Sequence, residues 1–163
     1  MPGETAAGRA SAPLVIRAVD HVSYTVPDLP QAVDFFVNVL GARVQYERSG
    51  KLDAGTAECF DVDAGASFRL AKLELAGAPL ELFEYRNTGR SGAPAANATC
   101  GGGHIGLLVD DFDAAMERLR EVPGVRLLGQ ASILSEDHPL AGRRWIYFQT
   151  PWGLQLELVS PVP

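Results

Sequence analysis

The stretch that decides the fold reads Asp-His-Val-Ser-Tyr-Thr-Val at residues 20–26, and a related stretch, Gly-His-Ile-Gly-Leu-Leu-Val, follows at residues 103–109. Aligned on His21 and His104, the two parts of the chain share seven identical residues over one short stretch. At average residue usage, about one or two identities would arise by chance. Leu-Glu-Leu also recurs at 80–82 and 156–158, with a glycine four residues before each glutamate. This repeat predicts an internally duplicated chain.

Each half contains the same order of predicted elements. In the first half a strand precedes Asp28, the predicted N-cap of a helix that Gly41 closes. Apolar residues recur at helical spacing between them, and β-branched and aromatic runs follow. The expected strands and helices cover residues 19–26, 28–41, 43–46, 68–75 and 79–85, and then 104–109, 111–122, 125–128, 145–149 and 154–159.

These elements predict an α+β fold of two tandem βαβββ modules. The modules are expected at residues 16–86 and 103–160, joined by a linker at 87–102 that is rich in Gly, Ala, Asn and Thr. Residues 1–15 are small and polar and are expected to form a flexible tail.

Composition limits the classes of partner. The formal net charge is −6 and the basic residues are scattered, which argues against nucleic acid. No apolar run approaches the ~20 residues of a membrane span, so no membrane partner is expected. The two cysteines lack paired spacing and no signal peptide is evident, so we expect a cytoplasmic protein with reduced thiols.

Two histidines and two glutamates occupy equivalent points of the repeat. Strand alternation places each of them on one face with defined neighbours. His21 shares its face with Ser23 and Thr25, Glu81 with Phe83 and Tyr85, and Glu157 with Val159. An unpaired carboxylate buried in an apolar strand costs several kcal/mol. Two imidazoles and a divalent cation would offset that cost.

Each of these residues alone has a structural interpretation. A single histidine in an apolar strand is more often a structural residue than a ligand, and either glutamate could lie on an edge strand. The repeat maps His onto His and Glu onto Glu, which favours convergence of all four. The predicted metal ligands are His21, Glu81, His104 and Glu157.

Three motifs resemble the vicinal oxygen chelate superfamily, which includes glyoxalase I, methylmalonyl-CoA epimerase, extradiol dioxygenases and fosfomycin- and bleomycin-resistance proteins. They lie at residues 20–29, 102–111 and 151–158, and the resemblance extends from Ile16 to Ser160. It implies an eight-stranded, cup-shaped mixed sheet with the helices outside and carries the four ligands over. One departure, Gln-Thr-Pro-Trp-Gly at 149–153, lies in a turn.

The resemblance implies a metal-dependent lyase or isomerase of the glyoxalase or epimerase type. Imidazole and carboxylate ligands suit Zn²⁺, Fe²⁺, Co²⁺, Ni²⁺ or Mn²⁺. One such ion would stabilise the enolate that forms when a small oxygenated metabolite loses a C–H proton. Glu157 or Glu81 is expected to carry the proton. Ser23, Thr25, Phe83 and Tyr85 are the candidate substrate contacts, although each could equally fill the strand or the core.

Two alternatives stay open. An Fe²⁺ ring-cleaving dioxygenase would use His21, His104 and Glu157, which leaves Glu81 without a role. A non-catalytic antibiotic-binding protein is the second alternative, although such relatives tend to lack the metal ligands. Relatives usually form homodimers, so a homodimer is expected, with the cup formed within one chain or by exchange between two.

Polar residues outside the four ligands have weaker signals. His138 lies in a polar loop. A solvated loop histidine is a simpler interpretation than a lid residue or an acid-base group. Arg143 and Arg144 could meet an anionic substrate group. Adjacent strand residues face opposite ways, so at most one of them points into the cup.

Overall fold

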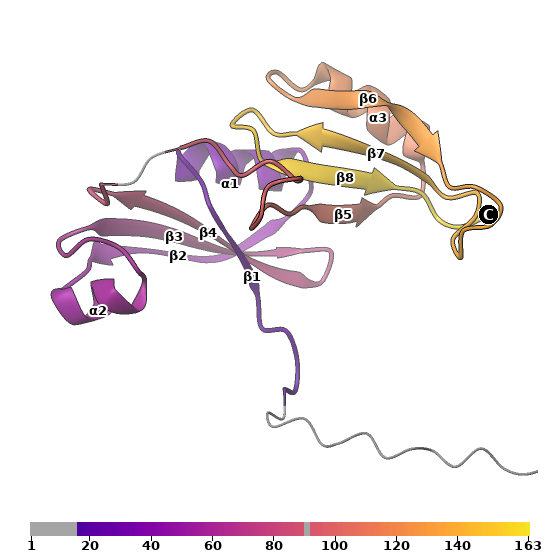
Figure 1. The fold of residues 1–163 in the computed structure, drawn as a ribbon. Coiled ribbons are helices and arrows are strands. Elements are labelled where there is room, and N and C mark those ends of the chain that lie inside the picture. Colours follow the sequence, from indigo (N-terminus) through magenta and orange to yellow (C-terminus); the bar gives the residue numbers. More distant parts are fainter. Residues whose placement is uncertain (1–15, 90–91) are drawn as a thin grey trace, which may run out of the picture.

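The computed structural model describes residues 16–89 and 92–163. It contains two four-stranded mixed sheets, each formed by one half of the chain (Figure 1). The α+β class and the two tandem modules are therefore confirmed. The expected tail, residues 1–15, lies outside the described residues, as do residues 90–91 of the expected linker.

The first module places its strands in the order β1-β4-β3-β2. β1 runs parallel to β4, and the other neighbours are antiparallel. Its elements are β1 (Val22–Thr25), α1 (Leu29–Asn38), β2 (Arg43–Lys51), α2 (Ala54–Cys59), β3 (Ser67–Leu75) and β4 (Ala78–Arg86).

The second module repeats this topology as β5-β8-β7-β6, again with one parallel pair, β5 with β8. In the described part of the chain, the second module has no counterpart of α2. Its elements are β5 (Ile105–Leu108), α3 (Phe112–Glu121), β6 (Arg126–Ile133), β7 (Arg144–Gln149) and β8 (Gln155–Val159).

Equivalent aspartates start the two long helices. The Asp28 carboxylate accepts a hydrogen bond from the Gln31 backbone N–H at 2.9 Å, and Asp111 accepts from Ala114 at the same distance. Each side chain thereby satisfies one of the backbone N–H groups that the first helical turn leaves unpaired. The predicted cap at Asp28 is confirmed, and Asp111 caps the second helix at the equivalent point of the repeat.

Leucines and phenylalanines on the helix-covered faces form the core. Leu73 and Leu82 in the first module and Phe148 and Leu156 in the second are fully buried. One continuous apolar cluster includes residues of both modules. Trp152, in the β7–β8 turn, packs edge-on against Phe35 of α1, with ring centroids 5.5 Å apart. The opposite faces of the sheets are thus left to carry polar groups.

The structure differs from the expected fold in three respects. The strands form two separate sheets of four, because within residues 16–89 and 92–163 the edge strands β1 and β5 pair only with β4 and β8, respectively. β2 and β6 extend well beyond the predicted ends at residues 46 and 128. The helix α2 was not predicted; the Asp53 side chain caps it, and Ala57 anchors it in a small second apolar cluster.

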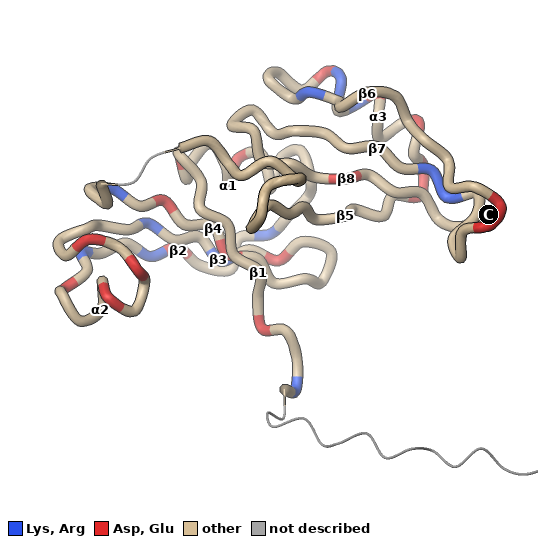
Figure 2. The backbone as a smooth tube through the Cα atoms, in the orientation of Figure 1, with Lys and Arg blue, Asp and Glu red and all other residues tan. Residues whose placement is uncertain are grey.

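Within the described residues, no helix is both long enough and apolar enough to cross a membrane. Basic and acidic residues are interspersed along both modules (Figure 2).

Candidate metal and substrate site

His21 and Glu81 form the first pair of predicted ligands. His21 lies directly before β1, and its Nε2 is 3.4 Å from Oε2 of Glu81. On the other side of the ring, Nδ1 is 2.8 Å from Oδ2 of Asp20. The hydrogen bond from His21, together with the charge of Lys72, holds the pKa of Asp20 below its usual value. An N–H at Nδ1 that donates to Asp20 leaves the Nε2 lone pair facing Glu81.

His104 and Glu157 form the equivalent pair in the second module. His104 Nε2 lies 3.3 Å from Glu157 Oε2, and its Nδ1 lies 2.9 Å from Oδ1 of Asn97. Gly106 leaves room for this carboxylate, because a Cβ at that position would sit 3.3 Å from Glu157 Oε2. The sequence repeat is therefore also a repeat of side-chain geometry.

The spacing within each pair fits two donors that share a metal ion. Separations of 3.4 and 3.3 Å exceed the usual length of an N–H···O hydrogen bond. Two ligand atoms that each bind a metal at about 2.1 Å, with an angle of about 105° between the bonds, lie about 3.3 Å apart. In both imidazoles Nδ1 is held by a side-chain oxygen, as the second ring nitrogen of a metal-binding histidine usually is.

The two pairs do not combine into one group within the chain. Among the described residues, no set of three or more His, Cys, Asp or Glu side chains lies close enough to hold one ion. The sequence analysis left open whether the four residues converge within one chain or between two chains, and within this chain they form two separate pairs. The physical reason is the separation of the sheets: β1 and β5, which follow the two histidines, do not pair with each other.

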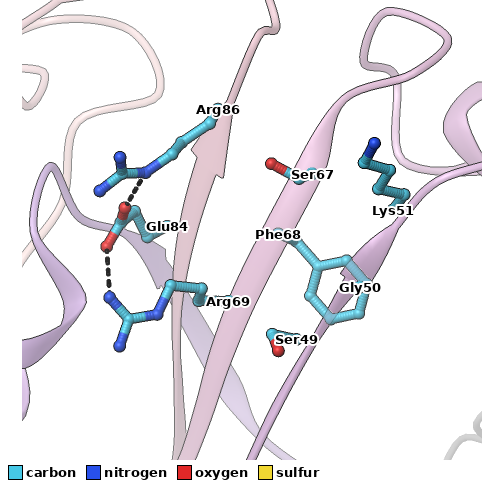
Figure 3. Close-up of a pocket in the computed structure, with 8 residues that line it drawn as sticks. All are labelled: Ser49, Gly50, Lys51, Ser67, Phe68, Arg69, Glu84 and Arg86. Atoms are coloured by element: carbon cyan, nitrogen blue, oxygen red, sulfur yellow. Dashed lines mark hydrogen bonds and ion pairs between the residues drawn. The ribbon is translucent and has the colours of Figure 1, made fainter.

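The other glutamates of the β3–β4 hairpin have structural contacts. Glu84 lies on the opposite face of β4, where its carboxylate accepts from the Leu29 backbone N–H at 2.9 Å and from Nε of Arg86 at 2.6 Å. Arg69 lies 3.6 Å away (Figure 3). Burial alone would raise the pKa of Glu84, but these partners outweigh it and lower the pKa. Glu74 pairs with Arg43. Glu81 is therefore the glutamate of this hairpin that faces a histidine.

Lys72 is a site residue that the sequence analysis missed. The β3–β4 register places it directly opposite Glu81, and its Nζ lies 3.1 Å from Glu81 Oε1 and 3.6 Å from Asp20 Oδ2. The residue is 9% exposed. Burial acts to lower the pKa of Lys72, but Glu81 and Asp20 outweigh that effect and raise it. The sequence signal for Lys72 was weak, because Arg69 and Glu74 are also charged residues of the 68–75 stretch.

Tyr147 occupies the equivalent position in the second module, opposite Glu157. Its ring meets the His104 ring edge-on, with centroids 4.9 Å apart, and it also contacts Trp145. The residues opposite the two glutamates therefore differ: Lys72 lies opposite Glu81, whereas Tyr147 lies opposite Glu157.

An aromatic wall adjoins Glu81 on the same face of the first sheet. Phe83 and Tyr85 are stacked with an interplanar angle of 5°, and Phe60, at the end of α2, contacts both rings. Burial and the charge of Glu81 raise the pKa of Tyr85. Ser23 lies beside Glu81 and Thr25 beside Phe83 in the strand register. The predicted shared face is confirmed, and Phe60 was missed because α2 was not predicted.

The remaining candidates have local contacts. His138 is exposed and accepts a hydrogen bond from the Leu140 backbone N–H. Arg144 forms two hydrogen bonds with Asp113 of α3 and lies over the Phe112 ring, on the helix side of the sheet. Of the two arginines, Arg144 is thus directed away from the cup face.

The match to a family profile covers most of the chain. Residues 18–158 match the profile of the Glyoxalase/Bleomycin resistance protein/Dioxygenase superfamily. A 2-epi-5-epi-valiolone epimerase of an Actinomyces species is 48% identical over 146 residues, which span 88% of this chain and 79% of that protein.

Solved structures of low sequence identity share the fold. A glyoxalase family protein from Bacillus cereus matches with a TM-score of 0.76 at 18% identity, covering 94% of this chain and 100% of its own. The fosfomycin resistance protein FosX from Listeria monocytogenes, in a structure with Mn(II) and a sulfate ion, matches with a TM-score of 0.57 at 19% identity, covering 90% and 93%. The chain belongs to the Glyoxalase/Bleomycin resistance protein/Dioxygenase superfamily.

Proposed function

We propose that this protein is a divalent-metal-dependent epimerase that inverts a carbon next to the carbonyl group of a small hydroxylated ketone. The observation that carries the proposal is the repeated His–Glu pair, whose spacing suits two ligands of one metal ion. The relative named as a 2-epi-5-epi-valiolone epimerase favours the isomerase branch of the superfamily over the lyase and dioxygenase branches.

The chemistry requires a proton to leave one face of a carbon and to return to the opposite face. A bound divalent ion would supply a Lewis acid that stabilises the negative charge on the carbonyl oxygen after the proton leaves. His21 and His104 would hold that ion together with the two glutamates. No electron is gained or lost, and no group other than the proton is transferred.

Glu157 and Glu81 are the proposed acid-base groups. The pseudo-twofold repeat brings them to the substrate from two sides, and inversion needs a proton acceptor on one face and a donor on the other. Ser23 and Thr25 would donate hydrogen bonds to substrate oxygens, while Phe83 and Tyr85 would pack against its carbon skeleton.

A second copy of the chain completes the proposed site. Each chain offers two half-sites. Among the described residues, the β1 and β5 edges are unpaired and carry exposed apolar residues, Val22 at 45% and Leu108 at 61%. In the proposed homodimer, β1 of one copy lies beside β5 of the other. His21 and Glu81 of one copy then meet His104 and Glu157 of the second copy, and eight strands form one cup.

The direct test is epimerisation of 2-epi-5-epi-valiolone in D₂O, followed by NMR. The proposal predicts inversion at one carbon with deuterium incorporated there, loss of both after chelation, and recovery with one of Mn²⁺, Fe²⁺, Co²⁺, Ni²⁺ or Zn²⁺. Inversion that survives complete removal of metal would contradict the metal site. Oxygen uptake with a catechol would support the dioxygenase branch instead.

A further inference from the structure

The first half-site is a closed ring of four side chains. Nδ1 of His21 contacts Asp20 at 2.8 Å, and Nε2 of His21 faces Glu81 at 3.4 Å. Lys72 closes the ring, because its ammonium contacts Glu81 at 3.1 Å and Asp20 at 3.6 Å. Lys72 thus touches both carboxylates that contact His21.

The two oxygens of Glu81 have different neighbours. Oε1 is hydrogen-bonded to Nζ of Lys72, whereas Oε2 faces Nε2 of His21. A carboxylate can bind a metal through one oxygen or through both. With Oε1 engaged by an ammonium group, Oε2 is the oxygen left for the metal. Glu81 would then carry a proton through Oε2, when that oxygen leaves the ion.

The second half-site lacks this restraint. Tyr147 stands opposite Glu157, and among the described residues Glu157 forms an ion pair with His104. Lys72 is also held in place, since its side chain is 11% exposed and lies between β4 and the start of β1. A mobile surface lysine would not define the orientation of its partner in this way.

We propose that Lys72 is a positioning residue that limits Glu81 to binding the metal through one oxygen, which keeps a coordination position open for the substrate. This inference rests on the proposed metal-dependent function and deepens it. Without Lys72, both oxygens of Glu81 are free to turn toward the ion. The metal then stays bound, but the position that the substrate needs is filled.

The test compares Mn²⁺ complexes of the purified full-length wild type, Lys72→Met and Lys72→Arg by water-proton relaxation, which reports exchangeable waters on the ion. We expect Lys72→Met to bind Mn²⁺ at least as tightly as wild type, to show fewer exchangeable waters, and to raise KM about tenfold or more, in the range for outer-shell partners. Lys72→Arg keeps a cationic donor. It should restore the wild-type water count and bring KM most of the way back to the wild-type value.

Arg43→Met is the matched control. This change removes the cation that pairs with Glu74, and Glu74 lies on β3 two residues after Lys72. The Arg43 ion pair does not involve His21 or Glu81. Its water count and KM should equal those of wild type. If Lys72→Met does not fold, Lys72→Gln provides a second neutral variant with a shorter reach.

Each outcome decides between the two proposals. A wild-type-like water count in the neutral variants, or the same change in Arg43→Met, overturns the role of Lys72 and leaves the proposed function intact. A wild type that binds no Mn²⁺ or other divalent ion overturns the proposed metal site and the role of Lys72 with it.

Discussion

At the scale of single residues, each histidine of the repeat uses its two nitrogens differently. Nδ1 contacts an oxygen behind the ring, from Asp20 in one half and Asn97 in the other, while Nε2 faces a glutamate. A charged partner behind His21 makes that imidazole the stronger donor to a cation. The third histidine of the chain, His138, is exposed in a loop and bonds to Leu140.

Removing either ligand histidine is expected to abolish tight metal binding. His21→Ala and His104→Ala should each weaken metal affinity by more than about 100-fold, beyond the usual effect of an outer-shell change. His138→Ala is the matched control and should retain full metal content. Metal analysis after dialysis checks all three variants, and full metal content in both ligand variants would contradict the assignment.

At the scale of elements, α1 is attached to its sheet by a buried carboxylate as well as by apolar packing. Glu84 is 2% exposed and binds the backbone N–H of Leu29 at the start of the helix. A negative charge at that end also complements the helix dipole. Glu84 therefore links β4 to α1 directly behind the face that carries Glu81.

Glu84→Gln should lower the free energy of unfolding by about 1.5–3 kcal/mol at pH 7, the range for hydrogen bonds to charged groups. Because the folded-state pKa of Glu84 is lowered, its contribution is present above its unfolded pKa and is lost as the pH falls through the folded pKa. Urea titrations at pH 7 and at progressively lower pH should therefore show the difference between wild type and variant shrinking in acid.

The control for this prediction is Glu117→Gln, which removes an exposed ion pair with Arg120 on α3. Exposed pairs contribute about 0–1 kcal/mol. Equal destabilisation by the two variants, or a Glu84→Gln effect that grows in acid, would contradict the account of α1.

The elements also show which features the sequence predicts. The first helix cap and the faces of the strands follow from local patterns, so the cap at Asp28 and the face that Glu81 shares with Phe83 and Tyr85 were predicted correctly. α2 has six residues, and its anchor Ala57 packs in a cluster with Leu52 and Ala66, an interaction that local periodicity does not encode. Lys72 was missed for a related reason: its contact with Glu81 depends on the register between two strands.

At the scale of the whole molecule, duplication determines the topology of each half but not how the halves meet. The repeat predicted two equivalent modules, and the two sheets have the same strand order. The repeat did not predict that the two sheets would remain separate. A repeat does not specify whether β1 pairs with β5 of the same chain or of another copy. The proposed site built from two copies rests on those two strand edges.

The most direct test of this account mixes two inactive variants, His21→Ala and His104→Ala, after partial unfolding and refolding together. If each site combines His21 of one copy with His104 of the other, every mixed dimer contains one intact site. With random pairing, half of the dimers are mixed, and each mixed dimer has one intact site out of two. The mixture should therefore recover about one quarter of the wild-type metal content and epimerase activity. Wild-type chains treated in the same way provide the reference. No restoration in a mixture shown to contain mixed dimers would contradict a site shared between two copies.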